Sequence, residues 1–283
     1  MTEDVKEEKE KKVMSLIEHL TELRGRLLKC IFALIIGSGV GWVYAGDLLH
    51  FVERPLTGHT YLTELKKNIY GSLKQQFPNF YERWKLGEDK GPAVTDRKLN
   101  YTAPLEPFFV QIKLSMIAGA VLALPIMLYQ LWMFIAPGLT KKERRFVIPF
   151  ITAGTMAFIV GALFFLFIIW PVIINFSLSY ESDGLRSWFS LTAYINFCMR
   201  LIVIFGLVFE LPIVSVILAR IGLITSGFLA RQRRFAVLAS AVVAAFHADL
   251  VTMAVVWIPL YLMYEVSIWG ARLLGKRPEP AAA

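Results

Sequence analysis

Glu210 lies in the middle of an apolar run, residues 201–218, that holds no other charged side chain. A run of this length and composition is typical of a membrane-spanning helix. A carboxylate at the centre of a bilayer costs about 2.5–3.5 kcal/mol on insertion scales, so it seldom persists without a function or a polar partner. Glu210 therefore indicates proton chemistry or a polar contact inside a membrane.

A second group of ionisable side chains precedes the first apolar run. Glu18, Glu22 and Arg26 are four residues apart, so a helix would place them on one face, with His19 and Arg24 nearby. One interpretation is intrahelical ion pairs, each worth about 0.2–0.5 kcal/mol. The other is a docking site whose carboxylates receive a cationic ligand. The spacing alone favours the first interpretation.

A third group follows Pro137 and Gly138, a pair that ends helices. One acid, Glu143, stands in this short loop among four bases: Lys141, Lys142, Arg144 and Arg145. Taken alone, Glu143 would only balance charge.

The composition indicates a polytopic membrane protein. The 283 residues are 56% hydrophobic and 18% charged, and the mean hydropathy is +0.56, which soluble domains do not reach. The net charge of +8 comes from short basic clusters beside apolar runs; this placement favours membrane topology and anionic lipid over nucleic acid. P-loop, HExxH and CxxC motifs are absent. We therefore expect neither an enzyme nor a cofactor or metal.

The apolar runs predict an all-α protein with six membrane helices. They cover residues 27–44, 108–135, 146–175, 194–218, 235–246 and 250–269. The fifth is short against the roughly 20 residues that a span needs. It forms either a re-entrant hairpin with the sixth or one of two short helices that thin the bilayer. Basic clusters favour six crossings with both termini in the cytoplasm. The charged N-terminus lacks the apolar core of a signal peptide, and it is acidic and poor in Ser and Arg, unlike an organelle transit sequence. We therefore expect a bacterial inner membrane.

These runs divide the chain into a charged tail (1–14), a membrane domain (15–270) with a long external loop at about 46–107, and a short tail (271–283). In the loop, apolar residues at three- and four-residue steps between Leu62 and Phe77 predict one helix. Prolines inside or beside the spans predict kinks and a curved, concave bundle. Small residues at Gly37–Gly41 predict close helix packing.

Four blocks in order carry a family resemblance: residues 19–27, Pro125–Arg145, Phe205–Pro212 and Ile258–Glu265. They resemble TatC, the multispanning receptor subunit of the twin-arginine protein translocase. The resemblance implies a glove-like bundle of six helices, with a short fifth and sixth helix. It also implies transport driven by the proton-motive force, with no cofactor.

The resemblance further implies a signal-peptide site. Glu22 and Glu143 would bind the paired arginines, because a carboxylate accepts a bidentate, charge-assisted bond from guanidinium that ammonium cannot match. The same cytoplasmic surface would include His19, Arg24, Phe134, Arg144 and Arg145.

The implied partners are folded cargo, single-span subunits of the TatA and TatB type, membrane lipid and further copies of the chain. Glu210, Asp249 and Pro55 match positions that the family associates with the membrane interior, partner contact and the first external loop.

Three features depart from the family pattern. The external loop is longer, and Phe246-His247-Ala248 stands where Thr-Pro-Pro is common before the acid. Arg200 lies in the outer part of the fourth span, about 15 Å of helix from Glu210. We expect Arg200 to snorkel outward or to meet a polar group of a partner.

An alternative is a small-solute or proton-coupled transporter that uses Glu210 as its protonation site. Kinked helices favour it. The lack of an inverted repeat, and of a second acid within a turn of Glu210, argues against it.

Overall fold

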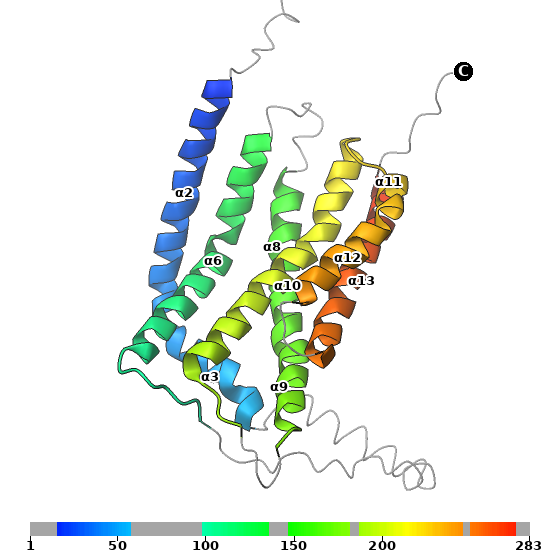
Figure 1. The fold of residues 1–283 in the computed structure, drawn as a ribbon. Helices are drawn as coiled ribbons and strands as arrows, with labels where there is room; N and C mark the ends of the chain where they lie inside the picture. Colours follow the sequence, from blue (N-terminus) through cyan, green and yellow to red (C-terminus); the bar gives the residue numbers. More distant parts are fainter. Residues whose placement is uncertain (1–15, 58–97, 136–146, 182–186, 246–249, 276–283) are drawn as a thin grey trace, which may run out of the picture.

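The computed structural model describes residues 16–57, 98–135, 147–181, 187–245 and 250–275. Every regular element in these ranges is a helix, which confirms the all-α class. Five of the described helical segments are long and apolar enough to cross a membrane. The described chain begins and ends at the same end of the bundle, where α2 starts and α13 finishes (Figure 1).

Helices α2 (Leu16–Val43) and α6 (Glu106–Ile135) lie side by side. The amphipathic N-terminal segment is continuous with the first span, so its charged face is held rigidly by the membrane helix. The two helices approach closely because Gly37 faces Gly119. A Cβ on Gly37 would lie 2.6 Å from the carbonyl oxygen of Gly119, a distance that no side chain tolerates. The packing predicted for the glycines is confirmed, and it fixes the rotation of α2 against α6.

The third span combines α8 (Val147–Phe164), a π-helical turn (η3, Phe165–Ile169) and α9 (Trp170–Leu178). Proline at position 171 has no backbone N–H to donate, and the wider turn before it accommodates that loss. The residues around the turn form the centre of the core: Phe165, Trp170 and Phe205 are almost completely buried.

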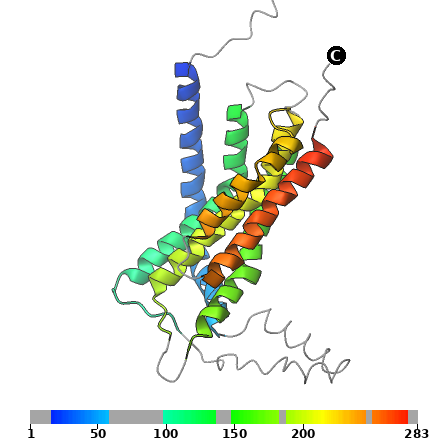
Figure 2. The ribbon, with the colours of Figure 1, turned by 45° about the vertical axis from the view of Figure 1, so that its right-hand side comes forward.

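Helix α10 (Leu191–Arg220) crosses the bundle obliquely, and both α10 and α13 are tilted relative to α2 (Figure 2). Its N-terminus is capped by the side chain of Ser190, which accepts from the backbone N–H of Ala193. Gly222, with φ of +79°, makes the turn that follows its C-terminus.

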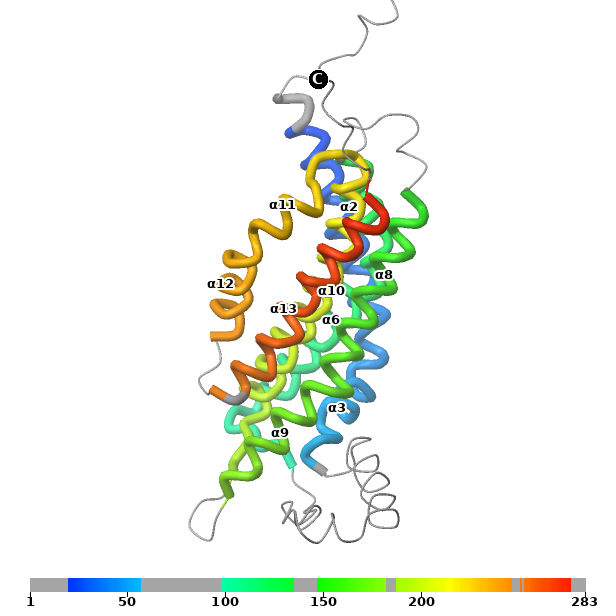
Figure 3. Tube along the Cα trace, turned by 90° about the vertical axis from the view of Figure 1, so that its right-hand side faces the viewer, coloured from blue at the N-terminus to red at the C-terminus, as the bar shows by residue number. Residues whose placement is uncertain are grey.

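The C-terminal part consists of α11 (Ser226–Arg231), α12 (Arg233–Ala244) and α13 (Leu250–Leu274). Helix α12 runs alongside α13 (Figure 3). Its 12 residues extend about 18 Å, well short of the roughly 30 Å hydrocarbon layer. Helix α13 has 25 residues, so it is longer than the family resemblance implies. The structure therefore supports a bundle of five to six spans, in which only the fifth is short.

The segment that follows the first span begins with helix. Helix α3 (Ala45–Glu53) and the short helix η1 (Arg54–Thr57) pack under the end of the bundle opposite the start of α2. The carbonyl oxygen of Val52 accepts hydrogen bonds from the Trp170 Nε1 (3.1 Å) and from the Tyr194 hydroxyl (2.9 Å). The helix predicted between Leu62 and Phe77 lies outside the described residues.

Candidate functional site

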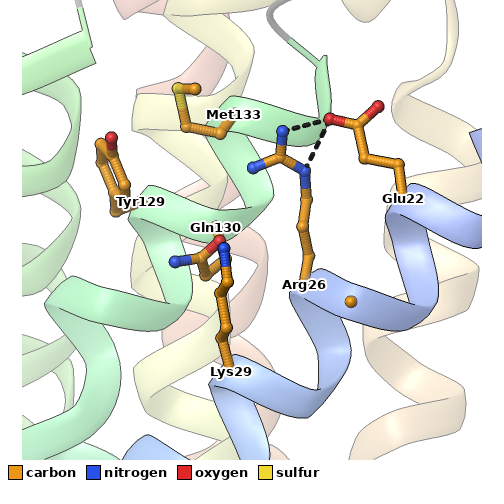
Figure 4. Close-up of a pocket in the computed structure, with 7 residues that line it drawn as sticks. Glu22, Arg26, Lys29, Tyr129, Gln130 and Met133 are labelled. Atoms are coloured by element: carbon orange, nitrogen blue, oxygen red, sulfur yellow. Dashed lines mark hydrogen bonds and ion pairs between the residues drawn. The ribbon is translucent and has the colours of Figure 1, made fainter.

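A cleft of about 420 Å³ opens between α2 and α6, near the end of the bundle where α2 begins. Figure 4 shows side chains from both helices converging on it. It is lined by Glu22, Gly25, Arg26, Lys29, Tyr129, Gln130 and Met133. The rigid contact between α2 and α6 deeper in the bundle holds the two walls in place.

The carboxylate of Glu22 forms an ion pair with Arg26, one helical turn further along α2. The Arg26 Nε also donates to Glu22 Oε1 at 3.1 Å. The two side chains are only 23% and 16% exposed, respectively. The second oxygen, Oε2, is buried and has no hydrogen-bond partner among the residues that the structure describes. Glu22 therefore keeps one unused acceptor, and a carboxylate oxygen without a donor is costly in such a setting.

Positive charge outweighs negative charge among the described lining residues. Glu22 is the one acid in the cleft, whereas Arg26 and Lys29 are both cations. Figure 4 shows the Lys29 side chain directed toward Gln130, which is 9% exposed. A cationic ligand would favour one more carboxylate here, and the sequence that follows α6, outside the described residues, contains one in Glu143.

Among the described residues that were predicted for this site, only Glu22 lines the cleft. Arg24 is exposed on α2 and does not line the cleft. His19 belongs to α2, but its side chain is not described. Phe134 is half-buried in the last turn of α6, next to Met133. Glu143, Arg144 and Arg145 lie outside the described residues.

Sequence reasoning did not single out Gly25, Tyr129, Gln130 or Met133 as lining residues. Gln130 carried a usable signal, because an amide inside an apolar run needs a polar neighbour. Which face it occupies depends on the rotation of α6 against α2, and the linear pattern does not give that rotation.

Glu210 lies in the interior, on α10, and is 8% exposed. In the described part of the chain, its two carboxylate oxygens have no hydrogen-bond partner. They lie over the α-carbon of Gly154, where a Cβ would be 3.0 Å from Oε2. Leu128 of α6 borders the same space. Within the described part of the chain, Glu210 is the one buried acid.

The other positions taken from the resemblance differ in their surroundings. Pro55 is buried in η1, at the end of the bundle that carries α3. Asp249 lies outside the described residues. Arg200 is exposed on α10 and lines a groove that also holds Lys113.

Comparison with known proteins agrees with this architecture. The family model described as Sec-independent protein translocase protein (TatC) matches residues 18–259. The TatC protein of Aquifex aeolicus is 34% identical over 267 residues, which cover 93% of this chain and 97% of the relative. That of Desulforapulum autotrophicum is 33% identical over 264 residues, covering 93% and 86%. That of Escherichia coli is 30% identical over 259 residues, covering 91% and 88%.

A solved structure has the same fold. The crystal structure of a twin-arginine translocase receptor, TatC, superposes with a TM-score of 0.70 at 32% identity. The match covers 91% of this chain and 99% of the solved one.

Proposed function

Because the chain belongs to the TatC family and is thus a receptor subunit of the twin-arginine translocase, we propose that the α2–α6 cleft binds the paired arginines of a signal peptide. It is a multi-pass membrane protein of a bacterial inner-membrane family and not an enzyme. The observation that carries the proposal is the unused oxygen of Glu22 at a cleft between two rigid helices.

Guanidinium suits this acceptor. Its planar fork of donors engages a carboxylate with directional, charge-assisted bonds, whereas an ammonium is a compact point charge. One arginine of the peptide would use Oε2 of Glu22, either beside Arg26 or in its place. Tyr129 and Met133 would supply the apolar wall against which the stem of the arginine packs.

The second arginine would be read by Glu143 from the loop that follows α6. Two carboxylates would then balance the charges of Arg26 and Lys29, so that the cleft would no longer repel a dicationic ligand. His19, Arg24, Phe134, Arg144 and Arg145 would form the rim that contacts the rest of the peptide.

Single-span partner subunits would pack against the bundle at the level of Glu210, with Asp249 and the outer turn at Pro55 as further contacts. Glu210 is suited to this because it is buried and carries acceptors that no other described residue uses. Six crossings with cytoplasmic termini would follow if α12 crosses a thinned bilayer. The described chain begins and ends at one end of the bundle, which is consistent with an even number of crossings. We further propose that this chain assembles with other copies of itself in the translocase complex.

The transporter alternative has no added support, because Glu210 is the one buried acid of the described residues and has no acidic neighbour with which to relay a proton.

Photocrosslinking tests the proposed site. A signal peptide with a photoreactive residue next to its arginine pair is added to membranes containing the whole chain. Glu22→Gln and Glu143→Gln should each reduce the crosslinked yield. Asp47→Asn, an equal charge change at an exposed position on α3, should leave the yield unchanged. An unchanged crosslinked yield in both glutamine variants would refute the proposed site.

A further inference from the structure

A second cavity, of about 890 Å³, lies between α6 and α10 and reaches α2 at Leu34. Most of its lining is apolar, and Met116 and Val203 on its walls are 49% and 36% exposed. It is therefore a groove that is open to the surroundings of the bundle. Its volume is within the range of sites that hold drug-sized or larger apolar ligands.

Two cations and one amide interrupt this apolar lining. Lys113 on α6 donates from Nζ to Oδ1 of Asn196 on α10 at 2.9 Å. Arg200 stands one turn beyond Asn196 on the same helix and also lines the groove. Within the residues that the structure describes, neither cation forms an ion pair with an acid. Two cations beside an apolar groove favour an anionic, partly apolar occupant.

The depth of the two cations also fits such an occupant. Helices α6 and α10 have 30 residues each, or about 45 Å, close to the full bilayer thickness with its headgroups. Both start at the end of the bundle that carries α3 (Figure 1). Lys113 and Arg200 lie about 10 and 14 Å along the helices from those starts. Both therefore lie near the boundary between headgroups and hydrocarbon, within reach of the interface by snorkelling.

We propose that this groove binds an anionic phospholipid of the outer leaflet. The phosphate lies between Lys113 and Arg200, and an acyl chain follows the apolar wall formed by Met116, Ala120 and Val203. A lipid fits better than the acidic side chain of a partner helix, because it fills the apolar groove and neutralises the cations at its mouth. An anionic headgroup is preferred to a zwitterionic one, whose own cation would face Lys113 and Arg200.

The test measures lipid binding to the whole chain, purified in detergent and delipidated. Phosphatidylglycerol or phosphatidylcholine is titrated, and the bound lipid is counted by native mass spectrometry. The test variant is Lys113→Gln with Arg200→Gln. The matched control is Arg54→Gln with Lys98→Gln, which removes two exposed cations near the α3 end without touching the groove.

We expect the groove variant to bind phosphatidylglycerol about 30-fold more weakly, which corresponds to about 2 kcal/mol for two interfacial cations. The control should bind as the unaltered chain does, and the unaltered chain should prefer phosphatidylglycerol to phosphatidylcholine. Inorganic phosphate added in excess should not displace the lipid, because it lacks the acyl chain.

Because the double variant removes the bond to Asn196, Val203→Trp provides a second probe that keeps both cations and obstructs the acyl chain. It should weaken binding of both lipids.

Three results would overturn the proposal: equal phosphatidylglycerol binding by the groove variant and its control, equal binding of both lipids by the unaltered chain, or displacement by phosphate. If instead the groove variant loses a single-span subunit while lipid binding is unchanged, the lipid site is refuted and the cations face an acidic partner.

Discussion

Replacing Arg26 by glutamine is expected to tighten the binding of a twin-arginine signal peptide, although the change removes a residue that lines the cleft. In the structure the guanidinium of Arg26 occupies one oxygen of Glu22. An incoming arginine must share the carboxylate with Arg26 or displace it, and it also meets the positive charge of Arg26. Glutamine keeps much of the side-chain volume and removes both obstacles.

The magnitude follows from the burial and spacing of this ion pair. Its partners are one helical turn apart and partly covered, at 16% and 23% exposed. Pairs of this kind contribute about 0.3–1 kcal/mol. Releasing Glu22 should therefore lower Kd by roughly two- to fivefold. Glu22→Gln should act in the opposite direction, because a hydrogen bond to a charged acceptor is worth about 1.5–3 kcal/mol, or roughly 10- to 150-fold in Kd.

The assay is titration of a fluorescent signal peptide into the whole chain in lipid nanodiscs, at low and at high salt. Arg272→Gln is the matched control. It removes one exposed cation from the last turns of α13, far from the cleft in sequence, and should leave Kd unchanged. If Arg26→Gln weakens binding as strongly as Glu22→Gln does, competition by Arg26 is refuted, and Arg26 instead orients the carboxylate.

Three further predictions concern the elements that position the sites. Gly119→Val should force α2 and α6 apart, because the added side chain overlaps the facing backbone. The free energy of unfolding in detergent should fall by about 1–3 kcal/mol, and an unchanged melting temperature would contradict this packing. Tyr194→Phe and Trp170→Phe should have non-additive effects on the free energy of unfolding in a double-mutant cycle. The carbonyl of Val52 keeps one donor in each single variant and loses both in the double variant, which leaves a buried acceptor unpaired at a cost of about 1–3 kcal/mol. Additive effects would argue against the shared acceptor. Burial raises the pKa of Glu53 above the ordinary carboxyl value, so the folded state holds the proton more tightly than the unfolded state does. The free energy of unfolding should therefore fall as the pH rises from about 4.3 through the pKa of Glu53 in the fold. Glu53→Gln should remove that fall, and parallel pH profiles of the two proteins would refute a contribution from Glu53.

The membrane helices were predictable because a long apolar run leaves the chain few alternatives in a bilayer. The run at 108–135 became α6 and the run at 194–218 became α10, each with ends shifted by three residues or fewer. The short fifth run became α12 within two residues of its predicted ends. Length alone did not decide whether α12 crosses the membrane, because bilayer thinning and re-entry are both inexpensive.

Features that depend on long-range geometry were not predictable. The π-helical turn at Phe165–Ile169 lies in a uniformly apolar run, where only Pro171 hints at it. The two donors that hold Val52 come from residues more than a hundred positions away.

The cleft was predictable in part. The spacing of Glu22 and Arg26 predicted their ion pair, and the structure confirms it. The opposite wall, including Gln130, depends on how closely Gly37 and Gly119 let the helices approach. The rotation of α6 against α2 follows from this tertiary contact and cannot be read from the sequence pattern.

The most direct test of the proposed receptor site compares the affinity of the purified whole chain for a twin-arginine signal peptide and for its twin-lysine counterpart. We expect a clear preference for arginine, which Glu22→Gln and Glu143→Gln each reduce. Equal affinity for the two peptides, or a preference that survives in both variants, would contradict it.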